Sequence, residues 1–307
     1  LAGPADPHHR RQIMSRAGEF LSTRLRRFGK TLKLLAQNKV GFFGLIVILV
    51  LVILSFVGPF FIPPQTVSNV SAINKPPSVE HPLGTDFMGR ENWVMFIHGG
   101  REVITVAFLA GLFTTVIAVI VGAVSAFIGG KVDSTLMTIT DIWLTLPRFL
   151  LLVVIATIIA LDSSWTLALF LAVIGWPGLA RQIRSQFLSL KQREYIEAAQ
   201  LLDLGRPHII FREMLPNMMS FIIIAMIQSM AAAIYSQTGL VFLGVVPFGN
   251  NWGVMFSLAY AKNAIYNPNA AASLLVPMGG IILLQLGLVL FSRSLEEIFN
   301  PRLRSGL

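Results

Sequence analysis

The sequence predicts an all-α, polytopic membrane protein with six transmembrane helices. Of the 307 residues, 54% are hydrophobic and only 13% are charged, whereas soluble domains average roughly 45–50% apolar and 25% charged residues. The mean hydropathy is correspondingly high, at +0.71. The apolar residues also occur in long stretches that are almost free of charge. Because a hydrocarbon core about 30 Å thick needs about 20 apolar residues per helix, these stretches can be counted as spans.

Six stretches have the length and composition of a span. They are 41–62, 103–128, 136–161, 165–180, 218–243 and 271–291. Pro147 and Arg148 interrupt the third span, and only a short turn separates it from the fourth, so we expect these two spans to form a helical hairpin. An extracytoplasmic segment, 63–102, follows the first span, and the other five spans form one core over 103–292.

The distribution of Lys and Arg predicts the orientation. Nineteen of these 24 residues fall in 1–40, 129–134, 181–216 and 293–307. Because basic loops near the spans remain in the cytoplasm, both termini are predicted to be cytoplasmic, with 293–307 as a tail. Within 1–40, apolar residues at helical spacing predict an amphipathic helix on the inner membrane surface.

The net charge of +9 indicates a membrane surface rather than nucleic acid as a partner. Most of the positive charge flanks spans on one side, where anionic lipid headgroups attract it. The chain contains no cysteine, which excludes disulfides, thiolate metal sites and cysteine nucleophiles. The five histidines show no ligand spacing, so no metal site is expected.

The polar segment 181–217, between the fourth and fifth spans, carries the functional signal. Tyr195, Ala198, Ala199 and Leu202 belong to the apolar face of a short predicted helix, and Gly205 followed by Pro207 is typical of a helix stop and a new start. Glu197 lies beside the two small alanines, which allow another protein to approach closely. The segment therefore indicates a docking site for a soluble partner. An ordinary amphipathic loop without a partner is the alternative, and periodicity alone does not exclude it.

Two motifs in this segment resemble the signature loop of bacterial and archaeal ATP-binding cassette importer permeases. They are Glu197-Ala198-Ala199 and Leu215-Pro216-Asn217. In that family the loop docks on a cytoplasmic ATPase, which implies a coupling role for Tyr195, Glu197, Ala198, Ala199, Asp203, Gly205, Leu215 and Pro216. Further matches resemble the second permease of dipeptide, oligopeptide and nickel importers, namely His81-Pro82-Leu83-Gly84-Thr85-Asp86, Gly89-Arg90, Gly129-Gly130, Asp133, Asp141, Pro147, Phe242-Leu243-Gly244, Asn251-Trp252-Gly253 and Asn300-Pro301-Arg302-Leu303-Arg304.

The resemblance implies the type I importer transmembrane fold and a set of partners. These are a second, homologous permease, two ATPase subunits that bind ATP and Mg, and an extracytoplasmic solute-binding protein. This chain is expected to be non-catalytic and to bind no cofactor, because it lacks a phosphate loop of the Gly-x4-Gly-Lys-Ser/Thr kind. The expected location is the cell membrane of a bacterium or archaeon. Asp86, Arg90 and Trp252 are the predicted external contacts.

The sequence departs from the family pattern at four positions, one of which is Val241, where the subgroup has Ser. The family usually has Gly at Asp203, the subgroup has Glu at Gln237, and Arg is common at Thr138. Gln237, with Met226 and Met230, is predicted to line the translocation path, although lipid or core packing is the commoner use of methionine.

Two charged residues lie in or near the third span. A charge at the bilayer centre costs about 2.5–3.5 kcal/mol on insertion scales. Asp141 and Arg148 are seven residues apart and on similar helix faces, so we expect them to pair for structural reasons rather than to bind substrate.

Short peptides are the default cargo by family resemblance, and β-linked oligosaccharides of the cellobiose type or nickel complexes remain alternatives. Gln237 and the outer aromatic residues Trp252, Tyr260 and Tyr266 leave room for a sugar. A secondary transporter is the alternative from another class. It would need intramembrane ionisable groups and usually an internal repeat, but no convincing repeat is found and the fifth and sixth spans are uncharged. A receptor-anchoring membrane protein would leave the polar segment unexplained.

Overall fold

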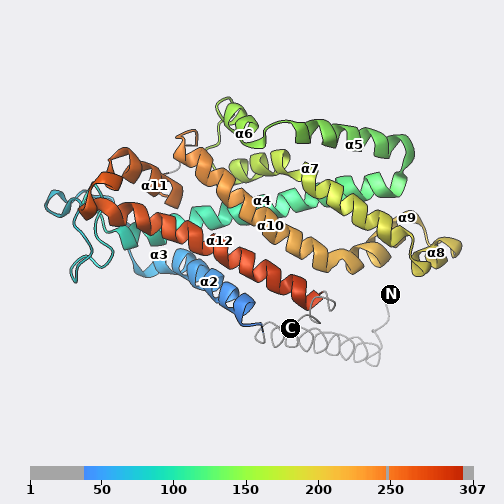
Figure 1. Cartoon of the computed structure of the whole chain (residues 1–307), viewed down its shortest axis with the longest axis horizontal. Coiled ribbons are helices and arrows are strands. Elements are labelled where there is room, and N and C mark those ends of the chain that lie inside the picture. Colours follow the sequence, from blue (N-terminus) through green and yellow to red (C-terminus); the bar gives the residue numbers. More distant parts are fainter. Residues whose placement is uncertain (1–37, 247–248, 300–307) are drawn as a thin grey trace, which may run out of the picture.

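The computed structural model describes residues 38–246 and 249–299, in which every regular element is a helix (Figure 1). This confirms the all-α prediction for the described residues. The predicted amphipathic helix within 1–40 and the motif 300–304 fall almost entirely outside them. The α-helices are α2 (Lys39–Phe56), α3 (Gly58–Phe61), α4 (Asn92–Ile128), α5 (Gly130–Thr145), α6 (Arg148–Ala156), α7 (Ser164–Lys191), α8 (Glu194–Leu201), α9 (Arg206–His208), α10 (Leu215–Phe242), α11 (Trp252–Ala261) and α12 (Ala271–Phe299).

Five helical stretches are long and apolar enough to cross a membrane. They are Lys39–Phe61, Asn92–Ile128, Ser164–Lys191, Arg206–Phe242 and Pro268–Phe299. The helices α5 and α6 form a sixth span if they are counted together, although an angle of 84° separates them. The break falls at Leu146-Pro147, where proline forces the preceding residue into an extended conformation. Five of the six predicted spans are therefore present as long helices, and the bent pair α5–α6 corresponds to the third.

The long helix α4 forms the centre of the bundle, with α7, α10 and α2 packed against it (Figure 1). It begins at Asn92, before the predicted start at Val103, so part of the segment predicted as extracytoplasmic is helical. Its 37 residues extend about 55 Å at 1.5 Å per residue, which exceeds a hydrocarbon core of about 30 Å. The helix therefore projects beyond the bilayer.

The helices α2 and α12 cross closely at glycines. A Cβ atom on Gly44 would lie 2.8 Å from the carbonyl oxygen of Gly287, a contact that only glycine allows. Small residues at helix crossings are the usual packing device within membranes, because they let two backbones approach. The same pair is joined at its inner end, where Asn38 Nδ2 donates a hydrogen bond to Glu297 Oε2 at 2.5 Å.

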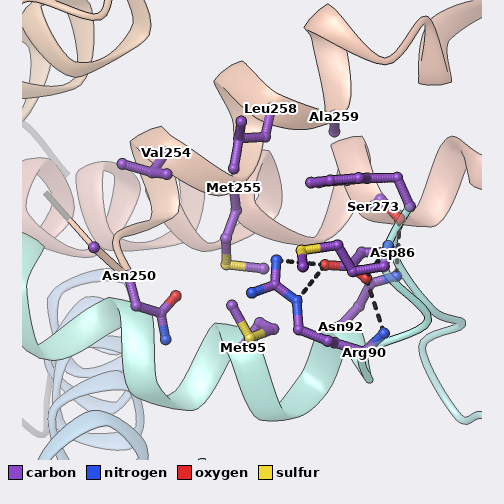
Figure 2. Close-up of a pocket in the computed structure, with 13 residues that line it drawn as sticks. Asp86, Arg90, Asn92, Met95, Asn250, Val254, Met255, Leu258, Ala259 and Ser273 are labelled. Atoms are coloured by element: carbon purple, nitrogen blue, oxygen red, sulfur yellow. Dashed lines mark hydrogen bonds and ion pairs between the residues drawn. The ribbon is translucent and has the colours of Figure 1, made fainter. Parts of the chain in front are cut away.

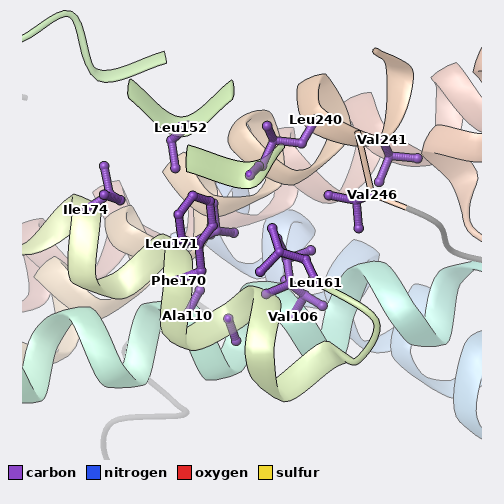
Figure 3. Close-up of a cluster of buried hydrophobic side chains, with 14 of the residues drawn as sticks. Val106, Ala110, Leu152, Leu161, Phe170, Leu171, Ile174, Leu240, Val241 and Val246 are labelled. Atoms are coloured by element: carbon purple, nitrogen blue, oxygen red, sulfur yellow. The ribbon is translucent and has the colours of Figure 1, made fainter. Parts of the chain in front are cut away.

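The outer half of the bundle is held by a buried apolar cluster that joins four helices. Figure 3 shows Val106 of α4, Leu152 of α6, Leu171 of α7 and Leu240 of α10 pointing toward one another. Each is almost fully buried, and burying a side chain of this size contributes about 1.5–3 kcal/mol. Through Leu152, the short helix α6 is fixed to the bundle core.

Candidate functional site

The coupling segment, 194–214, contains α8, a turn, α9 and one wide π-helical turn (Ile209–Met214). It lies at the end of the bundle opposite the long outer loop (Figure 1). Two residues of α8, Ile196 and Ala199, are buried, whereas Tyr195, Glu197 and Ala198 are exposed. The anionic side chain and one of the two alanines of the motif therefore face outward, available to a partner.

The inner face of the coupling segment packs on the ends of the long helices. Ile196, Ile209 and Met214 are buried in one cluster with Ile183 and Phe187 of α7. The same cluster includes small residues of α4 and continues into α10 through Met218. Because close-packed side chains transmit displacement instead of absorbing it, a movement of α8 would be passed to three membrane helices.

The turn between α8 and α9 contains two residues with left-handed backbone conformations. Asp203 has φ +49° and Gly205 has φ +73°. A Cβ atom on Gly205 would meet no atom within 4 Å. The position therefore favours glycine because of its positive φ and not because of crowding. Asp203, where the family usually has Gly, adopts a conformation that Asp tolerates better than most residues. The turn therefore depends on two residues with left-handed conformations rather than on Gly205 alone.

An exposed apolar tip on this segment was missed by sequence reasoning. Leu201, Leu202 and Phe211 are 88%, 71% and 68% exposed. Of the four residues predicted for the apolar face of this helix, only Ala199 is buried, whereas Tyr195, Ala198 and Leu202 are exposed, and Leu202 lies beyond the end of α8 at Leu201. The only signal in the sequence is a Leu-Leu pair next to the turn. Large apolar side chains that stay exposed close together in the sequence are candidates for a protein interface.

The outer motif residues organise their loop from within (Figure 2). Asp86 is 7% exposed, and its Oδ1 accepts hydrogen bonds from the backbone N–H groups of Met88 and Arg90, both at 2.8 Å. Its Oδ2 pairs with the guanidinium of Arg90, with Nη2 at 2.7 Å. This ion pair lines a small pocket of about 110 Å³, which α4, α11 and Ser273 of α12 complete.

Trp252 is also internal, with 0% of its surface exposed. Its ring stacks on Phe96 of α4 with 4.8 Å between centroids, and its Nε1 donates a hydrogen bond to the Phe96 carbonyl at 2.7 Å. It thereby fixes α11 to α4. The role of Asp86, Arg90 and Trp252 as external contacts stays a prediction.

The three residues predicted to line the path lie on α10, in different surroundings. Gln237 is buried and its Nε2 donates a hydrogen bond to the carbonyl of Val103 at 2.9 Å. Met230 lines an apolar cavity of about 480 Å³ between α2, α4, α10 and α12. Met226 is partly buried, and its carbonyl oxygen would lie 3.1 Å from a Cβ atom on Gly111 of α4. Their role in transport stays a prediction.

Two ion pairs join α5 to α7, which belong to the third and fourth predicted spans. Arg184 contacts Asp133 through both Nε and Nη2 at 2.5 Å, and Arg181 pairs with Asp141. The expected pairing of Asp141 with Arg148 is wrong, because the 84° bend turns Arg148 away from the face that carries Asp141. The aspartate is matched by an arginine forty residues further along the chain.

Residues 94–305 match the family described as binding-protein-dependent transport system inner membrane component. This match covers more than half of the chain. The chain belongs to this family of transport permeases. A second match, over residues 27–77, is to the N-terminal transmembrane domain of oligopeptide transport permease C.

Three relatives of this permease are similar over most of their length. A putative peptide permease protein of Brucella suis is 32% identical over 270 residues, covering 87% of this chain and 88% of the relative. The dipeptide transport system permease protein DppC of Bacillus subtilis is 36% identical over 225 residues, covering 72% and 70%. The oligopeptide transport system permease protein OppC of the same organism is 30% identical over 272 residues, covering 87% of each chain.

Family membership identifies this permease as a multi-pass membrane subunit with the type I importer fold. The structure brings the predicted coupling residues together at one end of the bundle, with Leu215 and Pro216 at the start of α10. Their docking role is not tested by the similarity and stays a prediction.

Proposed function

We propose that this permease is the membrane subunit of an ATP-driven, binding-protein-dependent importer of short peptides. The observation that carries the proposal is the coupling segment, which exposes Leu201, Leu202 and Phe211 and packs its buried residues on α4, α7 and α10. A surface of this kind suits an ATPase subunit that closes on ATP and pushes the membrane helices. Peptide as cargo is supported by the relatives named as peptide, dipeptide and oligopeptide permeases.

The proposed complex contains four further subunits. A second, homologous permease completes the path, two ATPase subunits bind ATP and Mg, and an extracytoplasmic protein delivers the solute. This chain binds no cofactor and performs no hydrolysis. It spans the cytoplasmic membrane of a bacterium or archaeon with 194–214 in the cytoplasm, and the pair of permeases alternates between outward-open and inward-open states.

The fold gives less support to a sugar cargo than the sequence did. Trp252 and Gln237 are both buried and hydrogen-bonded to the backbone of α4. Tyr260 and Tyr266 remain exposed, but they lie at the outer surface rather than in a cavity that could hold an oligosaccharide. Peptide therefore remains the proposed cargo.

The test is affinity purification of the tagged chain from its native membrane, followed by mass spectrometry of the retained proteins. We expect a second permease, ATPase subunits and a binding protein. The variants Glu197→Arg and Leu202→Glu should retain the second permease. The amount of ATPase recovered with them should fall about tenfold or more, because each substitution places an unpaired charge inside a desolvated interface.

The matched control is Val79→Glu, a fully exposed apolar residue of the outer segment, which should leave ATPase binding unchanged. Wild-type ATPase recovery and wild-type transport in both coupling-segment variants would refute the docking role. Recovery of the chain alone, with transport in liposomes that needs no ATP, would favour a secondary transporter.

A further inference from the structure

The apolar cavity of about 480 Å³ between α2, α4, α10 and α12 also has Trp165 of α7 in its lining. None of its lining side chains is charged, and Thr105 contributes the one hydroxyl group. That hydroxyl donates a hydrogen bond to the backbone carbonyl of Arg101 at 2.7 Å, so its proton is used within α4. An apolar cavity of roughly 150 Å³ already stays dry and takes up benzene. The larger cavity therefore favours an apolar occupant over water or a peptide.

The cavity extends along α2 for about the depth of one lipid leaflet. Its lining on this helix runs from Ile48 to Phe56, a separation of eight residues, or about 12 Å at 1.5 Å per residue. Half of a hydrocarbon core about 30 Å thick is about 15 Å. Phe56 ends α2 on the side of the bundle that carries the outer loop (Figure 1). The cavity therefore has the length and position of an acyl chain in the outer leaflet.

The cavity is open at the surface of the bundle. Two of its lining residues, Phe108 and Trp165, are 46% and 63% exposed. Trp165 is the second residue of α7, and tryptophan is enriched at the level of the lipid headgroups. An acyl chain can therefore enter the cavity from the side, past residues that suit the boundary between headgroup and hydrocarbon.

A cation lies at the outer end of the cavity. Arg101 is not part of the lining, but its Cζ atom is 5.8 Å from the centroid of the Phe56 ring, which is. It also precedes the lining residue Thr105 by four residues, about one helical turn. Its side chain is exposed and forms no ion pair with any other residue that the structure describes. A guanidinium in this position suits a phosphate, which it binds through parallel N–H groups.

We propose that this cavity binds one acyl chain of an outer-leaflet phospholipid, with the headgroup phosphate at Arg101. The chain fills the space between α2, α4, α10 and α12 and thereby joins the first and last membrane helices to α4. Met230, which the sequence predicted to line the translocation path, contacts the lipid chain in this arrangement.

The second permease could cover the same surface. A phospholipid is favoured because it carries both required features in the right order, an apolar chain about one leaflet long and an anion at its outer end. It is also present in the surrounding bilayer at high concentration. Coverage by the second permease is an outcome that the test distinguishes.

The test uses the permease purified in detergent together with the subunits that it retains. Bound lipid is washed out, and phosphatidylglycerol with a photoreactive diazirine in one acyl chain is added below saturation. After illumination, mass spectrometry measures the labelling of 48–56 and 104–109. The second probe is diacylglycerol with the same chains, which lacks the phosphate and reports whether the cavity itself is intact.

We expect phosphatidylglycerol to label both segments in the wild-type protein. Arg101→Gln should lower this labelling about fivefold, the effect of losing an ion pair that water screens. Labelling by diacylglycerol should change less than about twofold in this variant, because it offers the guanidinium no phosphate. The matched control is Lys262→Gln, another exposed outer cation over a ring, 5.6 Å from the centroid of Phe87, which should leave both labels unchanged.

A second variant, Thr105→Trp, fills the cavity and should lower labelling by both probes. Its control is Thr157→Trp, since Thr157 is also a helix threonine whose hydroxyl donates to a carbonyl of its own helix, but it lies outside the cavity. Unchanged labelling by both probes in Thr105→Trp would overturn the proposal, because the chain would then lie elsewhere.

The absence of label from 48–56 and 104–109 in the wild-type complex would also overturn the proposal, because the second permease would then cover the cavity. Wild-type labelling by phosphatidylglycerol in Arg101→Gln would reject the phosphate contact. Equal losses for the two probes in Arg101→Gln would reject it as well, because a change in the shape of the cavity, and not the missing charge, would explain them.

Discussion

The coupling segment, 194–214, and the outer loop, 62–91, are both polar excursions from an apolar bundle, yet they differ in what they expose. The outer loop directs its motif residues inward, so that Asp86 and Arg90 form a nearly buried ion pair. The coupling segment exposes Glu197 and the large apolar residues Leu202 and Phe211. The motif of the outer loop therefore consists of buried residues that hold the loop together, whereas the motif of the coupling segment includes exposed residues.

The largest effect on stability is expected in the outer region, from Trp252→Ala. The substitution removes a fully buried indole, its stack on Phe96 and its hydrogen bond, and should lower the free energy of unfolding by about 3–5 kcal/mol. Thermal unfolding of the purified protein in detergent measures it, with the exposed Tyr266→Ala as the control. Equal melting temperatures for the two variants would mean that Trp252 does not fix α11.

A smaller loss is expected from Asp86→Ala in the same loop. This change leaves the Arg90 guanidinium and two backbone N–H groups without their acceptor, and should cost about 3 kcal/mol. The control is Glu80→Ala, an exposed carboxylate of the same loop. The measurement is thermal unfolding together with protease sensitivity of 62–91. If both variants unfold alike, the loop is organised by something other than this ion pair.

The smallest effect is expected in the coupling segment, from Asp203→Gly. Because Asp203 has φ +49°, glycine should relieve strain and raise the free energy of unfolding by about 1 kcal/mol. Asp203→Val, which disfavours this conformation, should act in the opposite sense. Hydrogen exchange at residues 201–205 in the two variants reports the local change. A loss of protection in Asp203→Gly would contradict a left-handed conformation there.

Much of the architecture was accessible from sequence because the bilayer imposes a strong rule. Helix length and the absence of charge predicted the six spans, and Pro147 predicted the break in the third. The polar stretch around Glu197 could be recognised because it stands out between two apolar spans, and the packing of membrane helices does not require it. The angle of 84° at the break was not accessible, since a proline indicates a kink but not its size.

The pairing and exposure of individual side chains were harder to predict. Asp141 finds Arg181 on the next helix, a contact that depends on how two helices lie side by side and not on spacing within one. Leu202 was assigned to the apolar face of the predicted helix because its spacing fits a helix, but α8 ends one residue earlier, at Leu201. The burial of Trp252 depends on α4, more than 150 residues away in the chain.

The close crossing of α2 and α12 has a consequence for how the protein is made. The helix α2 is synthesised before the rest of the described bundle, but the glycine surface at Gly44 fits against Gly287 near the other end of the chain. During insertion, that surface has no native neighbour until α12 has left the ribosome. The bundle therefore closes late in biogenesis, and a chain that stopped before α12 would leave α2 in the lipid without its main packing partner.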